Sequence, residues 1–85
     1  MKLVVVSPQH KQEYDIEWIE AFTSVGSLII QEGHAPIIAT LIAGSDFTFI
    51  LAITGEKKII KMIRPGFLEV SRMSVLALIT QDTAL

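Results

Sequence analysis

Apolar and polar residues alternate with a period of two along part of this chain. Tyr14, Ile16 and Trp18 stand between acidic residues, which is the pattern of a strand with one face in water. After Trp18 the alternation slips by one position, because Ile19 and Ala21 become the apolar residues. One extra residue in a strand, a β-bulge, produces such a slip. We therefore expect a bulge near Trp18.

The remaining apolar segments are short and are separated by residues that favour turns. Their composition predicts strands at residues 3–6, 28–30, 37–42, 47–53, 58–63, 67–70 and 75–79, besides the one that begins at residue 13. The segments 47–53 and 58–63 flank Thr54-Gly55-Glu56 and form the clearest hairpin, with Ile53 expected on the same strand face as Phe47. The polar residues 80–83 are where order is expected to fade. This spacing, without a helical period, indicates an all-β fold, a small β-sandwich or flattened barrel of mostly antiparallel strands.

The backbone is most heavily specified between Thr23 and Pro36. Gly26 and Gly33 bracket an apolar run there, and Pro36 keeps the residue before it out of helical geometry. We expect a turn, a strand and a second turn in this stretch. Gly66 lies in a further turn, and if it holds a positive φ, Gly66→Val is expected to destabilise the fold, because a β-branched side chain tolerates that φ poorly.

Length and composition limit the possible functions. A chain of 85 residues is expected to form a single domain, residues 1–85. Its net charge of −2 provides no positive electrostatic field to attract nucleic acid. Without cysteine it has no thiolate ligands for a metal. No apolar run reaches the roughly 18 residues of a membrane span, so a soluble, cytoplasmic protein is expected. The hydrophobic fraction of 51% is high for so small a chain, and we expect some apolar surface to meet a partner.

Candidate chemistry is sparse. His10 lies in a polar stretch typical of a solvated turn, whereas His34 lies in the constrained turn, where its ring could bond a backbone carbonyl or a partner. No phosphate-binding loop and no nucleophile with a matched base are evident. Two alternatives stay open. Ile60-Lys61-Met62 is weakly similar to the modified lysine hairpin of biotinyl and lipoyl carrier domains, and a small enzyme could be centred on His34.

The order and spacing of three motifs resemble the amino-terminal β-sandwich of the ε subunit of F-type ATP synthases. These motifs are Thr23-Ser24-x-Gly26-Ser27-Leu28, Gly33-His34-Ala35-Pro36-Ile37 and Gly66-Phe67-Leu68-Glu69-Val70. The resemblance implies a non-catalytic rotor subunit in the central stalk that links the γ subunit to the c-ring and couples proton-driven rotation to ATP synthesis. It implies a peripheral position at the cytoplasmic face of the bacterial inner membrane, with no cofactor and no bound metal.

The resemblance also implies two contact surfaces. The contact with the c-ring and the foot of the stalk falls on residues of the two turns and the strand between them: Ser24, Gly26, Ser27, Leu28, Gly33, His34 and Ala35. The contact with the γ subunit is expected on an apolar face left over from the core: Phe47, Phe49, Leu51, Met62 and Phe67. Most relatives continue into a carboxy-terminal helical hairpin that inhibits ATP hydrolysis and in some bacteria binds ATP. We expect this chain to lack the hairpin, its inhibition and its ATP site.

Overall fold

The computed structural model describes residues 1–79, and every regular element among them is a β-strand. No helix in this range is long and apolar enough to cross a membrane. The segment 80–83, where order was expected to fade, lies outside the described residues. In chain order the strands are β1 (Lys2–Val6), β2 (Lys11–Thr23), β3 (Gly26–Gln31), β4 (Ile37–Leu41), β5 (Asp46–Leu51), β6 (Lys57–Lys61), β7 (Gly66–Val70) and β8 (Ser74–Ile79).

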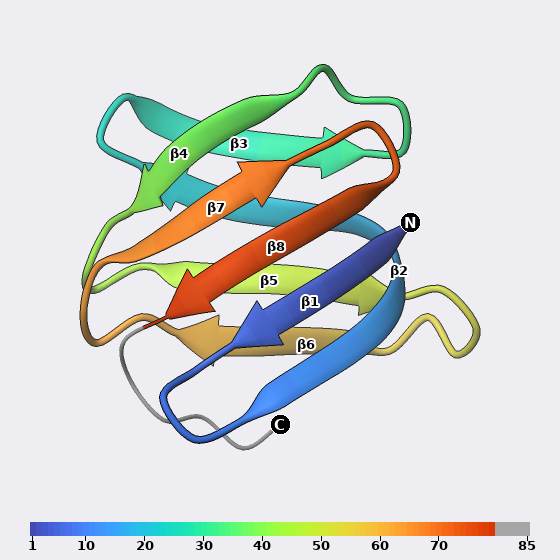
Figure 1. The fold of residues 1–85 in the computed structure, drawn as a ribbon, viewed down its shortest axis with the longest axis horizontal. Coiled ribbons are helices and arrows are strands. Elements are labelled where there is room, and N and C mark those ends of the chain that lie inside the picture. The colour runs from blue at the N-terminus through green and yellow to red at the C-terminus, as the bar shows by residue number, and fades with distance from the viewer. Residues whose placement is uncertain (80–85) are drawn as a thin grey trace.

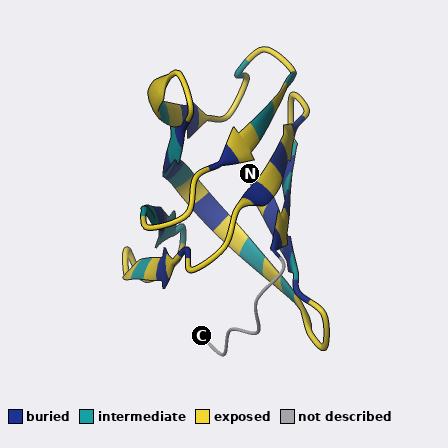
Figure 2. Ribbon diagram, turned by 90° about the vertical axis from the view of Figure 1, so that its left-hand side faces the viewer, coloured by how far each residue is buried: buried dark blue, intermediate teal, exposed yellow. Residues whose placement is uncertain are grey.

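The strands form two layers, which Figure 1 shows crossing one another and Figure 2 shows from the side. One layer has the order β1-β8-β7-β4, and the other places β3 and β5 on either side of β2, with β6 outside β5. The long β2 joins the layers, since it pairs with β1 near its start and with Leu41 of β4 through Thr23 at its end. All pairs are antiparallel except β1 with β8. The predicted all-β sandwich is confirmed.

The predicted irregularity in β2 is present. The register between β2 and β5 shifts between Ile16, which pairs with Leu51, and Ile19, which pairs with Phe49. In a regular strand, residues three apart point to opposite faces. The bulge lets Ile16 and Ile19 both point inward, and both are buried.

The core is built from apolar side chains of all eight strands, and three polar residues, Ser7, Thr23 and Thr48, are also buried. Alternation is clearest in β7, where Leu68 and Val70 are buried while Phe67 and Glu69 are exposed. Burial of such side chains is the main favourable contribution to folding. The buried apolar residues are Leu3, Val5, Ile16, Ile19, Ala21, Ile30, Leu41, Phe47, Phe49, Ile60, Met62, Leu68, Val70, Val75, Ala77 and Ile79.

One expectation about the local backbone is wrong, and the condition set for Gly66 is not met. The β5–β6 hairpin exists, but β5 ends at Leu51, whose amide and carbonyl bond the Glu56 carbonyl and the Gly55 amide, each over 2.9 Å. Ile53 therefore lies in the connecting turn, 90% exposed, and not on the core face of the strand. Gly66 is not among the glycines with positive φ; it is a buried residue at the start of β7, and its constraint is steric.

Candidate functional site

The first turn of the motif stretch closes the β2–β3 hairpin. Thr23 pairs with Gly26 across a two-residue turn, and its hydroxyl donates to the Gly26 carbonyl over 3.0 Å. The same hydroxyl oxygen accepts a hydrogen bond from the Val25 amide over 3.3 Å. Gly26 has a φ of 125°, which L-residues rarely adopt. The Thr23 side chain and Gly26 together hold this turn in one conformation.

The second turn follows β3 and carries His34. The Gly33 amide donates to the Arg72 carbonyl over 3.1 Å, which ties the turn to the β7–β8 connection. The His34 amide donates to the backbone carbonyl of Gln31 over 3.1 Å. The imidazole Nδ1 lies 2.7 Å from the Ala35 carbonyl oxygen. A carbonyl oxygen can only accept, so Nδ1 is the donor of this hydrogen bond. The ring is thus held by a backbone carbonyl, as the sequence suggested it could be.

The seven residues expected to meet the c-ring lie at the two ends and along the length of β3. None of them is buried: Leu28 and His34 are partly exposed, and the other five are exposed. Ile29, Gln31 and Glu32, which the sequence reasoning did not include, line a shallow pocket with Gly33 and His34. Alternation along β3 could have identified Ile29 and Gln31, because they share the strand face of Ser27. The residues of segment 24–35 other than the buried Ile30 form a surface that is called the β3 rim below.

The five residues expected to meet the γ subunit do not form one surface. Phe47, Phe49 and Met62 are 1%, 0% and 1% exposed and belong to the core, so the expectation is wrong for these three. Phe47 and Phe49 lie on the inner face of β5, where their rings pack with centroids 6.0 Å apart. Leu51 is half-buried against the core. Phe67 is exposed and faces outward from β7.

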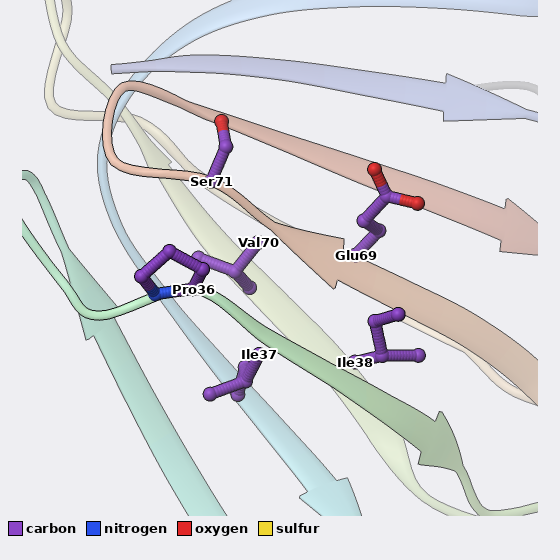
Figure 3. Close-up of a pocket in the computed structure, with 6 residues that line it drawn as sticks. All are labelled: Pro36, Ile37, Ile38, Glu69, Val70 and Ser71. Atoms are coloured by element: carbon purple, nitrogen blue, oxygen red, sulfur yellow. The ribbon is translucent and has the colours of Figure 1, made fainter.

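Phe67 belongs to an apolar surface on the outer side of the β1-β8-β7-β4 layer. Strand pairing places Phe67 beside Leu78, and Leu78 beside Val6. On the next row, Ile38 lies beside Glu69, the carboxylate of this surface, and Figure 3 shows these two side chains with the neighbouring Pro36 and Ser71. We call this surface the outer apolar face; its apolar members are Val4, Val6, Ile38, Phe67, Leu76 and Leu78.

The geometry does not assemble catalytic or carrier chemistry among residues 1–79. No group of three or more His, Cys, Asp and Glu side chains in this range could hold a metal ion. Lys61 is the last residue of β6, and its Nζ lies 4.0 Å from Oδ1 of Asp46 on β5. A swinging prosthetic group needs a lysine at the tip of a hairpin, and Lys61 is in a paired strand. The ring of His34 bonds a backbone carbonyl, and no hydrogen bond joins it to a nucleophile or carboxylate among residues 1–79.

Comparison with known proteins identifies the domain. A family model for the ATP synthase delta/epsilon chain β-sandwich domain matches residues 1–83, which confirms the resemblance seen in the sequence. No curated protein sequence matches the chain.

A chain in a cryo-EM structure of the Tetrahymena thermophila mitochondrial ATP synthase, described as central stalk and c-ring, has the same fold, with a TM-score of 0.74 at 16% sequence identity. The alignment covers 95% of the present chain and 63% of the Tetrahymena chain, so the present chain spans less than two thirds of that length. The present chain belongs to the family of ATP synthase delta/epsilon chain β-sandwich domains.

Proposed function

We propose that this chain is a non-catalytic rotor subunit of an F-type proton-translocating ATP synthase, in which it links the γ subunit to the c-ring. Family membership supports this role, as does the fold shared with a chain from a central stalk and c-ring structure. Catalysis then belongs to other subunits. The subunit acts peripherally, at the cytoplasmic face of a bacterial inner membrane, by transmitting torque between two contacts.

The observation that carries the proposal is the presence of two chemically different surfaces on one small domain. The β3 rim is exposed and mixed in polarity, and its residues include those that resemble the ring contact of the family. The outer apolar face lies on the other layer and exposes Phe67 beside Leu78, with Ile38 on the adjacent row. Permanent interfaces are more apolar than transient ones. We assign the outer apolar face to the γ subunit and the β3 rim to the c-ring.

Co-purification of this chain with the γ subunit from the same genome tests the proposal. The wild-type chain is expected to form a stable one-to-one complex. Phe67→Asp is expected to break it, because a carboxylate would be buried without a partner in the apolar contact. Ile53→Asp is the control, since Ile53 is also an exposed apolar residue but lies in the β5–β6 turn. Absence of a complex with the folded wild-type chain would refute the rotor assignment, and equal loss in both variants would refute the assigned surface.

A further inference from the structure

β3 and β6 are both edge strands, and they differ in how their free edges are protected against pairing with another chain. Among residues 1–79, β3 pairs only with β2, and β6 pairs only with β5. β6 has the sequence Lys-Lys-Ile-Ile-Lys, and lysines on an edge strand discourage pairing with another chain. β3 has the sequence Gly-Ser-Leu-Ile-Ile-Gln, with no charge, no proline and no bulge. The edge of β3 lacks the protection that natural sheet edges carry.

The edge of β4 is less open than that of β3. Pro36 precedes the strand, and Leu41 at its end pairs with Thr23 of β2. Proline near an edge strand is itself a protective device. Among the strands of residues 1–79, the unprotected pairing edge is therefore that of β3.

Backbone hydrogen bonds show which groups of β3 face this free edge. The Phe22 carbonyl accepts a bond from the Ile42 amide over 3.1 Å, so it points away from β3. Phe22 and Ser27 are therefore a pair without hydrogen bonds between them, and the pattern alternates along an antiparallel ladder. The amides and carbonyls of Ser27 and Ile29 point outward, and neither residue forms a backbone bond to another described segment.

The surroundings of the edge are acidic on the outer face of the layer. Glu20 lies directly opposite Ile29 on β2, and Glu32 follows the end of β3. Neither carboxylate forms an ion pair with a residue in the described range. On the inner face, Leu28 is only half-buried and packs against the core. A strand added at this edge would place alternate side chains on two faces. Those on the outer face would lie next to Ile29, across Ile29 from Glu20 and close to Glu32, and those on the inner face would lie beside Leu28.

We propose that the edge of β3 binds an extended segment of a partner protein as an additional β-strand. The segment has basic side chains on the outer face, near Glu20 and Glu32, and apolar side chains on the inner face, beside Leu28. A second copy of this chain fits less well, because edge-to-edge pairing would bring the same carboxylates together in an already acidic protein. Only the location of the partner, in an ATP synthase complex, rests on the proposed function; strand addition itself does not.

A peptide probe tests strand addition without any ATP synthase subunit. The isotopically labelled chain is titrated with a heptapeptide of alternating lysine and valine, and the amide resonances are followed by NMR. We expect saturable changes at Ser27 and Ile29, at least about fivefold larger than at the β6 edge, because outward amides there gain hydrogen bonds. A heptapeptide of alternating glutamate and valine is expected to bind at least about tenfold more weakly, because it places like charges together. Changes that are absent, or equal at both edges or with both peptides, would overturn the proposal.

Matched proline variants separate backbone pairing from side-chain contact. Ile29→Pro removes an outward amide without removing a β2–β3 hydrogen bond, and edge strands tolerate proline at such positions. Ile59→Pro is the control on β6: the bond from the Leu51 amide to the Glu56 carbonyl sets a register in which the Ile59 amide also points outward. Ile29→Ala is the second control, since it shortens the side chain and keeps the amide. Thermal melts of all three variants establish that they are folded.

The variants are then compared for binding to the probe peptide and to an ATP synthase complex depleted of this chain. Ile29→Pro is expected to weaken both by about tenfold, and the two controls by less than about threefold. Equal weakening by Ile29→Ala and Ile29→Pro would show a side-chain contact and overturn the proposal. Self-association that Ile29→Pro abolishes would assign the edge to a second copy, against the proposal. If wild-type chain binds the peptide but not the depleted complex, the proposed rotor function fails and strand addition stands.

Discussion

A Cβ atom placed on Gly66 would lie 2.7 Å from the carbonyl oxygen of Leu78, on the neighbouring strand β8. It would also lie 2.9 Å from Cε of Met62, a flexible side chain that could move aside. The Leu78 carbonyl belongs to the backbone of a paired strand and cannot move without disturbing the ladder. Gly66 is required by this close approach.

Gly66→Ala is therefore expected to destabilise the domain by about 1–3 kcal/mol, as overpacking does, and to lower its melting temperature by roughly 5–20 °C. Gly55→Asn and Gly66→Asn distinguish the two reasons why a position requires glycine, a positive φ and a lack of space for Cβ. Gly55 has a φ of 71° and open space around its Cα, so asparagine, which tolerates this φ, should be nearly neutral there. Asparagine at position 66 should destabilise at least as much as alanine. Calorimetry of the three variants checks this, and a neutral Gly66→Ala would contradict the clash.

Phe49 and Phe67 are expected to respond in opposite ways to truncation. Phe49 has no exposed surface, and its ring centroid lies 5.0 Å from that of Tyr14. Phe49→Ala should cost about 3–5 kcal/mol of unfolding free energy. Phe67→Ala, at an exposed position, should change it by about 0.5 kcal/mol or less while weakening the γ complex. Urea unfolding and a binding titration measure the two effects. A stable Phe49→Ala variant with weakened γ binding would restore Phe49 as a contact residue.

His34→Ala is expected to weaken attachment to the c-ring while leaving the isolated domain folded. The variant removes the bond between Nδ1 and the Ala35 carbonyl, which stabilises an exposed turn by about 1 kcal/mol or less. His10→Ala is the control, because His10 lies in the β1–β2 connection, which Figure 1 shows on the opposite side of the fold from β3. Binding to c-ring vesicles and thermal melting are measured for both variants. A large loss of stability in His34→Ala would assign His34 a structural role instead.

The Lys2 and Glu13 side chains form an ion pair across β1 and β2. The hydrogen bond from Lys2, and then its charge, lower the pKa of Glu13 below its usual value. Because the folded-state pKa is the lower one, this contact stabilises the fold above the unfolded pKa, and the contribution is lost as pH falls through the folded pKa. The loss should begin as the pH falls below the unfolded pKa of glutamate, about 4.3.

Lys2→Gln should raise the pKa of Glu13 toward its ordinary value, as a carboxyl NMR titration would show. Lys57→Gln on β6 is the control and should leave the pKa of Glu13 unchanged. Burial raises the pKa of Tyr14, and the charge of Lys58 acts in the opposite direction. The pKa of Tyr14 should therefore change little in Lys2→Gln. If the pKa of Glu13 is the same in Lys2→Gln as in the wild type, another group must cause the shift.

Local sequence determined much of this fold. The alternation around Tyr14 and Ile16 predicted β2, and the phase slip after Trp18 predicted its bulge. Turn residues placed the β5–β6 hairpin and both turns of the β3 rim, because glycine, proline and threonine act on the backbone within a few residues. The three motifs with their spacing were sufficient to indicate the family.

Packing between strands distant in sequence determined the rest. Phe47 and Phe67 are both aromatic residues in short strands, and only the pairing of the layers buries the first and exposes the second. Gly66 looks like a turn glycine until β8 brings the Leu78 carbonyl against it. The free edge of β3 likewise depends on which strand has no neighbour. Strand pairing is a nonlocal relationship, so no window of the sequence contains it.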